Sequence, residues 1–109
     1  MICRVWHGWT TPAHAAAYET YLRHALFPRL ARELGGRGYR GFHILRLQHE
    51  AETEFVTMVW FDTLDHVRGF AGDGYELPVI SDTARKLLSR YDACCAHYEL
   101  CDAGESNPD

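Results

Sequence analysis

The chain has 109 residues, of which 47% are hydrophobic and 13% aromatic, and its formal net charge is −4 with histidine neutral. This length suits one domain, and the hydrophobic content excludes wholesale disorder. Lysines and arginines are scattered along the chain. This argues against nucleic acid or an anionic membrane surface as the main partner, because both need a concentrated basic patch.

We expect one domain over residues 1–101 and a flexible acidic tail over residues 102–109. No apolar run approaches the ~20 residues that span a bilayer, and the N-terminus lacks the pattern of a secretory signal. These features favour a cytoplasmic protein. The cysteines form no Cys-x-x-Cys pair, and we expect reduced thiols at Cys3, Cys94, Cys95 and Cys101.

The first part of the chain predicts a strand followed by a long helix. Residues 2–9 are rich in β-branched and aromatic side chains, as strands are. Thr11 and Pro12 then supply a helix cap and a first helical residue. Pro28 cannot donate a backbone hydrogen bond, so we expect a kink or break near Phe27. The apolar stripe that defines this helix comprises Tyr18, Leu22, Ala25, Leu26, Leu30 and Leu34.

The second part predicts two strands joined by a polar hairpin connection, two helices separated by glycines, and a final strand. Asp62 and Thr63 can cap the first of these helices. The predicted elements are strands 39–48 and 54–61, a helix over 64–71, a helical stretch from Pro78 to Leu88 or Arg90, and a strand over 93–100.

The predicted order, β-α-β-β-α-β, indicates an α+β, ferredoxin-like fold with a four-stranded antiparallel sheet. Helices cover one face of such a sheet, so its strands should alternate apolar and polar residues. The third strand does not alternate, because Val56, Met58 and Trp60 are apolar as well as Phe55 and Val59. An apolar second face needs a cover, and we expect a second copy of the sheet to supply it in a homodimer.

Four stretches of the chain resemble the antibiotic-biosynthesis monooxygenase family of dimeric α/β barrels. They are Arg4-Val5-Trp6-His7-Gly8, Thr57-Met58-Val59-Trp60-Phe61-Asp62-Thr63-Leu64, Gly69-Phe70-Ala71-Gly72 and Ala96-His97-Tyr98-Glu99. The resemblance implies a homodimer with a cavity between each sheet and its own helices. Some members oxygenate polyaromatic phenols or quinols with O₂ and neither metal nor flavin. A related branch degrades haem, and many members have no established activity.

Three residues are the candidates for catalysis under this resemblance. Trp60 matches a cavity tryptophan of the family and could stack on a flat substrate, although a packed core tryptophan is equally compatible. His7 lies where several of these enzymes have asparagine and could take a phenol proton; alternatively it is bonded to a polar neighbour. Treating the first and third strands as parallel neighbours, we expect His7 and Trp60 to share a face. The third candidate is His97 on the last strand.

The candidates for substrate binding are Tyr98, His43 and His66. Tyr98 follows His97 on one strand, so the two side chains point to opposite faces and only one can reach the cavity. His43 either lines the cavity or decorates an edge strand, and His66 lies near a position where one branch of the family has tyrosine. Arg4 needs a partner if it is buried, for which an acid at the dimer interface is one candidate.

We predict no metal and no cofactor. Two histidines, His7 and His97, lack a third ligand at suitable spacing. The haem-degrading branch needs an Asn–Trp–His set, and residues 75–90 contain no histidine. Asparagine is also missing at His7 and at Val56, where some oxygenases carry it. The sequence therefore leaves three hypotheses: a cofactor-independent monooxygenase of a small aromatic phenol or quinol, a non-catalytic ligand-binding or interaction protein of the same dimeric fold, and, weakest, a haem binder.

Overall fold

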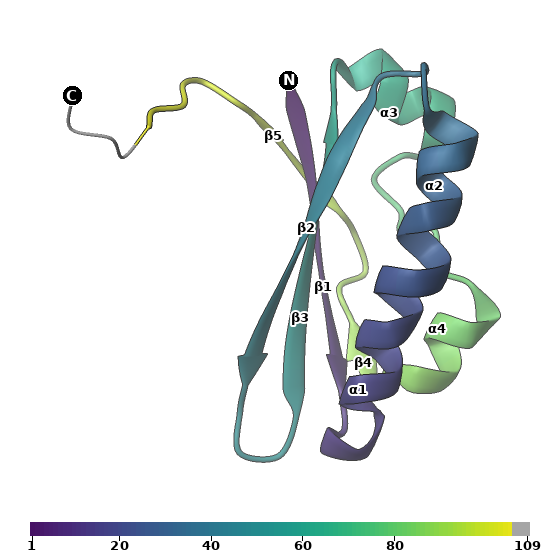
Figure 1. Ribbon diagram of the computed structural model, residues 1–109, viewed down its shortest axis with the longest axis vertical. Helices are drawn as coiled ribbons and strands as arrows, with labels where there is room; N and C mark the ends of the chain where they lie inside the picture. Colours follow the sequence, from purple (N-terminus) through teal and green to yellow (C-terminus); the bar gives the residue numbers. More distant parts are fainter. Residues whose placement is uncertain (106–109) are drawn as a thin grey trace.

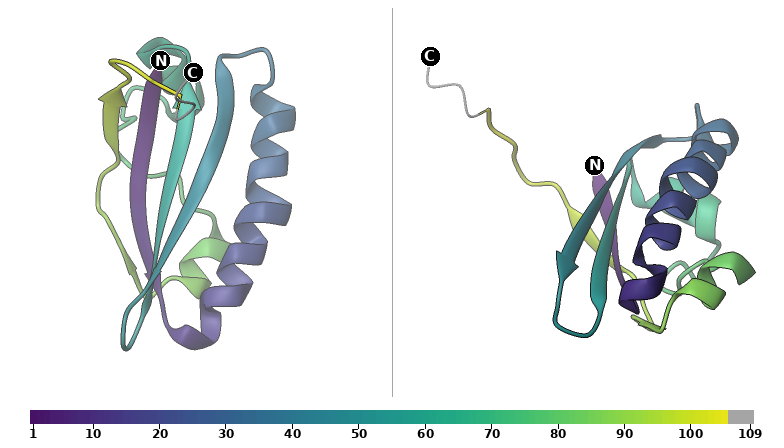
Figure 2. Two further views of the ribbon diagram at one scale, coloured as in Figure 1. Left: turned by 60° about the vertical axis from the view of Figure 1, so that its left-hand side comes forward. Right: turned by 60° about the horizontal axis from the view of Figure 1, so that its bottom comes forward.

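One antiparallel sheet and a layer of helices on one side of it make up the computed structural model, which describes residues 1–105. Figure 1 and the right-hand view of Figure 2 show the helices on one side of the strands. The elements are β1 (Ile2–Thr10), α1 (Pro12–Tyr21), the π-helical turn η1 (Leu22–Leu26), α2 (Phe27–Leu34), β2 (Tyr39–Gln48), β3 (Thr53–Phe61), α3 (Leu64–Ala71), α4 (Asp82–Leu87), β4 (Arg90–Tyr91) and β5 (Ala96–Glu99).

The strand order is β2-β3-β1-β4, and β5 also pairs with β1. This is the predicted α+β, ferredoxin-like fold. All pairings are antiparallel, including that of β1 with β3, so the expectation of parallel first and third strands is wrong. The hairpin makes β3 antiparallel to β2, whereas the helical crossover makes β2 parallel to β1. A strand inserted between β1 and β2 is therefore antiparallel to both.

The long first helix contains the predicted irregularity at Pro28. The backbone N–H of Phe27 donates to the carbonyl of Leu22, five residues back, which is the bond of a π-helical turn. Proline has no N–H for the carbonyl four residues before it, and the wider turn absorbs this defect without ending the helix. Residues of the predicted stripe that are buried include Tyr18, Leu22, Leu30 and Leu34.

The last third of the chain differs most from the prediction. α4 begins at Asp82 rather than at Pro78, because Ser81 caps it by accepting the N–H of Ala84 at 3.1 Å. The expected single last strand is split into β4 and β5. The N–H of Cys95 donates to the carbonyl of Glu76 at 2.7 Å instead of to β1, which interrupts the pairing.

The two faces of the sheet have different surroundings. On β3 the side chains of Phe55, Val59 and Phe61 are buried under the helices, together with Thr53 and Thr57. Alternate residues of the sheet face away from the helices, and we call this side the open face. Its residues are Cys3, Val5, His7 and Trp9 from β1, Gly41, His43, Leu45 and Leu47 from β2, Glu54, Val56, Met58 and Trp60 from β3, and Ala96 and Tyr98 from β5.

Residues 101–105 run away from the sheet (Figure 1). The remainder of the predicted tail, residues 106–109, lies outside the described residues. Within residues 1–105, no helix has the length and apolar character needed to cross a membrane. All four cysteines are free thiols.

Candidate functional site

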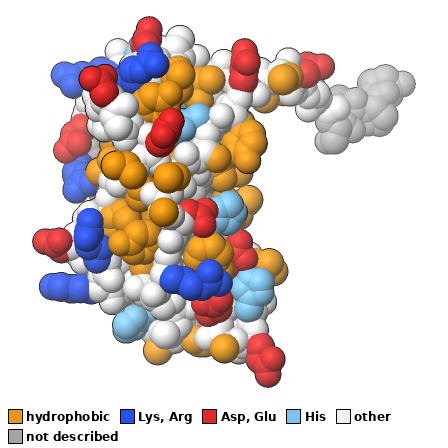
Figure 3. All heavy atoms as spheres, turned by 180° about the vertical axis from the view of Figure 1, so that it is seen from behind, with side chains coloured by type: hydrophobic (Ala, Val, Ile, Leu, Met, Phe, Trp, Pro, Cys, Tyr) orange, Lys and Arg blue, Asp and Glu red, His pale blue; other side chains and the backbone are white. Residues whose placement is uncertain are grey.

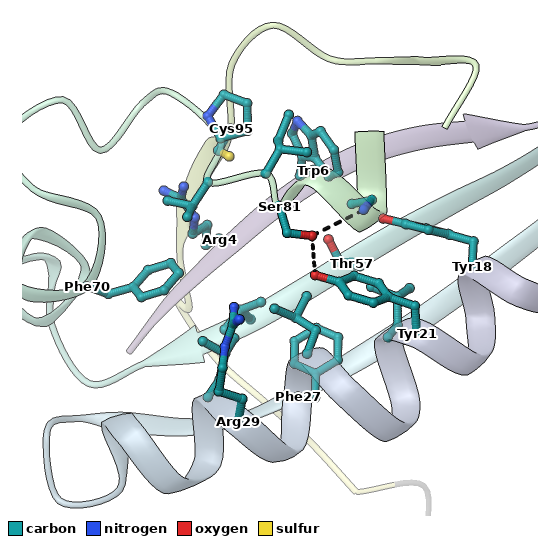
Figure 4. A pocket seen from close by; sticks show the side chains of 18 residues that line it. Arg4, Trp6, Tyr18, Tyr21, Phe27, Arg29, Thr57, Phe70, Ser81 and Cys95 are labelled. Atoms are coloured by element: carbon teal, nitrogen blue, oxygen red, sulfur yellow. Dashed lines mark hydrogen bonds between the residues drawn. The ribbon is translucent and has the colours of Figure 1, made fainter. Parts of the chain in front are cut away.

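A cavity of about 320 Å³ lies between the sheet and the helices. Side chains reach it from β1, β3, the long first helix, α3, α4 and the segment that leads into α4 (Figure 4). Most of its wall is apolar and much of it is aromatic, which suits a flat organic molecule. The lining residues are Arg4, Trp6, Tyr18, Tyr21, Leu22, Leu26, Phe27, Arg29, Leu30, Thr57, Val59, Phe70, Pro78, Val79, Ile80, Ser81, Ala84 and Cys95.

Two hydrogen-bonded hydroxyl groups lie on the cavity wall. Tyr21 Oη and Ser81 Oγ are 2.6 Å apart and hydrogen-bonded, and they come from α1 and from the residue that caps α4 (Figure 4). Thr57 adds a third hydroxyl from β3. Tyr18 packs edge-on against Phe55, and burial raises the pKa of its phenol, so it stays protonated. Hydroxyls in an apolar wall can orient a polar group of a ligand.

Arg4 is the one charged side chain on β1 that is buried, at 5% exposure. Its guanidinium donates to the carbonyl oxygens of Tyr75 and Leu77, the latter at 3.0 Å, and to Nε2 of His97 at 3.0 Å. Burial lowers its pKa, with a smaller opposing effect of Cys95, but an arginine remains charged. Its partners within this chain are two carbonyl oxygens and an imidazole nitrogen, all of them neutral groups.

His97 therefore faces the helices beside Arg4. Because a guanidinium can only donate, Nε2 of His97 must carry a lone pair, which places the ring proton on Nδ1. Burial and then the charge of Arg4 lower the pKa of His97, while Glu76 opposes them weakly. His97 does not line the cavity wall. It contacts Arg4, which does.

The thiol of Cys95 also lies on the cavity wall near Arg4 (Figure 4). Burial raises its pKa more than the nearby guanidinium lowers it, so the group is a protonated thiol at neutral pH. From the sequence, Cys95 was expected only to be a reduced thiol.

The structure places His7 and Trp60 on the open face, not in this cavity. They do share a face, but β1 pairs His7 with Val56 and Cys3 with Trp60. Four residues of β1 separate the two positions, which is roughly 13 Å at the usual rise of a strand. The two side chains therefore do not meet at one site within a single chain, and their catalytic roles stay predictions.

Each of these two residues has partners of its own on the open face. His7 Nδ1 is 2.8 Å from Oδ2 of Asp92, and its ring stacks on Trp9. Trp60 Nε1 donates to Nδ1 of His43 at 3.0 Å. Both polar groups are thus satisfied, as the alternative interpretation of His7 required.

The three candidates for substrate binding lie outside the cavity wall as well. His43 is on the open face beside Trp60, and Tyr98 lies in an apolar groove there with Met58 and Trp60. His66 is at the start of α3, where its Nδ1 is 2.8 Å from Oγ1 of Thr63. Of the predicted pair on β5, His97 is the residue that points toward the helices and Tyr98 the one that points away.

Sequence reasoning missed Tyr21 and Ser81, because both residues fall inside predicted helical stretches and were given no role beyond that. They lie 60 residues apart, and no local pattern links them. Arg4 did carry a signal, because it interrupts an apolar strand. Within residues 1–105, no cluster of three or more His, Cys, Asp or Glu residues is arranged to hold a metal ion.

Neither a protein-family model nor a curated protein matches the sequence of this chain. A crystal structure from Bacillus cereus, provisionally described as an antibiotic biosynthesis monooxygenase, has the same fold with a TM-score of 0.58. The two chains are 10% identical, and the match covers 97% of this chain and 95% of the other. At this identity the likeness shows a relationship of fold, which agrees with the family that the sequence resembles.

Proposed function

We propose that this protein is a cofactor-independent monooxygenase that oxidises an aromatic phenol or quinol in the cavity between sheet and helices. The observation that carries the proposal is the cavity of about 320 Å³ with its aromatic wall. Its support is the fold shared with a structure described as an antibiotic biosynthesis monooxygenase. Trp6, Phe27 and Phe70 supply flat surfaces for stacking.

Such a reaction needs no external reductant, because the phenol itself supplies the electrons. One atom of O₂ becomes the new quinone oxygen on a ring carbon, and the other leaves as water with the two hydrogens that the phenol loses. The hydroxyls of Tyr21 and Ser81 line the cavity and can bond an oxygen of the substrate, such as the second hydroxyl of a quinol, and so fix its orientation. No step is assigned to His7 or Trp60 in this scheme.

The test is O₂ consumption in metal-free buffer with a panel of naphthols, hydroquinones and anthrones. Val79 is 59% exposed at the rim of the cavity. A larger side chain there therefore obstructs entry to the cavity without disturbing the packing of the hydrophobic core. We expect Val79→Trp to abolish O₂ uptake. Thr83→Trp, an equally large substitution at an exposed position of α4 outside the wall, should leave it unchanged. No uptake with the whole panel would overturn the monooxygenase proposal.

The second candidate is a protein that binds an aromatic ligand without reacting with it. One observation favours it: among residues 1–105, no histidine, aspartate or glutamate lines the cavity, so the wall offers no ordinary general base. The same lack of a lining histidine counts against haem ligation there. Saturable binding of a naphthol that is blocked by Val79→Trp, with no O₂ uptake, would select this function.

We further propose that a second copy of the chain covers the open face. Leu45 and Leu47 on β2 are 50% and 58% exposed, and Tyr98 on β5 is 60% exposed, which is costly for a sheet that stays in water. Sedimentation velocity should show a dimer. Leu47→Glu should shift it toward monomer, whereas Leu77→Glu, at a leucine that is 62% exposed but away from the open face, should not. A wild-type monomer at high micromolar concentration would contradict this part.

A further inference from the structure

The charged groups on the cavity wall are all of one sign. Arg4 and Arg29 line the cavity, and in the described part of the chain no carboxylate does. The whole chain has 15 acidic residues against 11 basic ones, so a wall that carries two cations and no acid runs against the overall balance. A cavity with one sign of charge in an apolar wall concentrates ligands of the opposite sign.

Arg4 holds the inner of the two charges. Its three hydrogen bonds go to two carbonyl oxygens and one imidazole nitrogen, and no carboxylate of residues 1–105 pairs with it. A buried cation is normally compensated by an anion, because dipoles alone replace its lost hydration only in part. Three of the five N–H groups of the guanidinium are used, which leaves donors for a further acceptor.

Arg29 holds the outer charge. It extends from α2 toward the cavity, opposite Arg4 and Phe70 (Figure 4). Its side chain is 47% exposed and its Nε is 4.0 Å from Oε1 of Glu33, which is a weak contact between solvated groups. The guanidinium is therefore free to turn toward a bound anion at the rim.

The apolar part of the cavity wall indicates which kind of group carries the anion. The guanidinium carbon of Arg4 is 5.7 Å from the centre of the Phe70 ring, and the aromatic side chains of Trp6 and Phe27 also line the cavity. A small inorganic anion would leave this apolar surface wet. An oxyanion carried on an aromatic ring system satisfies both parts of the wall at once.

We infer that the ligand of this cavity is an aromatic oxyanion, a ring system with a carboxylate or an ionised phenol, whose negative charge is bound by Arg4 and Arg29. This rests on the proposal that the cavity binds an aromatic molecule and adds the charge of that molecule. For a phenol, it also supplies what the wall lacks: a cation beside the phenol oxygen favours the ionised form without a dedicated base.

Two probes of the same shape test the charge. The carboxylate of 2-naphthoate and the amide of 2-naphthamide differ in charge but hardly in size. We expect calorimetric titration of the full chain at neutral pH to give a Kd for naphthoate about tenfold lower than for naphthamide. Equal affinities would overturn the anion inference and leave the cavity proposal standing. Binding of neither probe would overturn both.

Three variants locate the charge. Arg29→Glu should weaken naphthoate binding about fivefold or more and leave naphthamide binding nearly unchanged. Arg32→Glu makes the same change of charge on α2 at an exposed residue outside the wall, and it should have no effect on either probe. Arg4→Gln should bring the two affinities together.

If Arg4→Gln does not fold, the comparison of Arg29→Glu with Arg32→Glu still tests the inference, because both of these residues are exposed and tolerate substitution. A loss of naphthoate affinity that is as large in Arg32→Glu as in Arg29→Glu would show a general effect of net charge and overturn the inference. If Arg29→Glu and a folded Arg4→Gln both still prefer naphthoate to naphthamide, the anion binds elsewhere, and the inference is overturned.

Discussion

The hydrogen bond between Tyr21 and Ser81 joins α1 to α4 across the cavity, and its contribution to stability can be worked out. Ser81→Ala removes this bond and also the cap of α4, because Ser81 Oγ accepts the N–H of Ala84. A cap contributes about 1 kcal/mol and a partly buried neutral hydrogen bond about 1 kcal/mol, so the variant should lose about 2 kcal/mol. Tyr21→Phe removes only the bond and should lose about 1 kcal/mol.

The double variant separates the two contributions. In the Tyr21→Phe background, Ser81→Ala should cost only the cap, about 1 kcal/mol, so the coupling energy is about 1 kcal/mol. Urea unfolding followed by circular dichroism measures it. With a slope of about 1.5 kcal/mol per molar urea, Ser81→Ala alone should lower the midpoint by about 1.3 M. If Ser81→Ala costs the same in both backgrounds, the two hydroxyls are not coupled and no hydrogen bond joins α1 to α4 at the cavity.

Two further predictions concern pH and packing. Because the pKa of His97 is lowered from its ordinary 6.5, the unfolded chain binds more protons below that value, and stability falls as the pH drops through the folded pKa. His97→Gln, whose amide oxygen can still accept from Arg4, should flatten this loss in urea titrations at about pH 7.5 and about pH 5; parallel losses would contradict it. Gly36 and Gly38 have φ near +82° and +83°, but only at Gly38 would a Cβ lie 2.2 Å from His66. Alanine should cost about 1 kcal/mol at Gly36 and about 1–3 kcal/mol more at Gly38 in thermal unfolding, whereas equal losses would exclude the clash.

The parts of the fold that local patterns determine were predicted well. β2 runs from Tyr39 to Gln48 as expected, because glycines precede it and polar residues follow it. Pro12 begins α1, and Thr63 caps α3 by accepting the N–H of His66. Each of these features depends on residues within a few positions of one another. The antiparallel relation of β1 and β3 depends on the whole topology, and there the sequence argument failed.

The location of the site depends on which face of each strand lies under the helices, and the sequence does not determine this. Both faces of β3 are apolar, so the strand does not reveal whether Phe55 or Trp60 lies under the helices. The resemblance favoured Trp60, whereas the structure buries Phe55 and puts Trp60 on the open face. Two of the three partners of Arg4 come from residues 75–77, a segment without regular structure more than 70 residues away. Such contacts between distant segments follow from tertiary packing, and the periodicity of a sequence does not predict them.

The central claim is that an aromatic ligand occupies the cavity between the sheet and the helices. Methyl NMR spectra of the chain with labelled leucines, recorded with and without 2-naphthoate, test it most directly. Leu22, Leu26 and Leu30 line the cavity, so their methyl signals should shift as the ligand is added. Leu45 and Leu47 on the open face should stay in place. Shifts confined to the open-face leucines, or no shifts at saturating ligand, would contradict the claim.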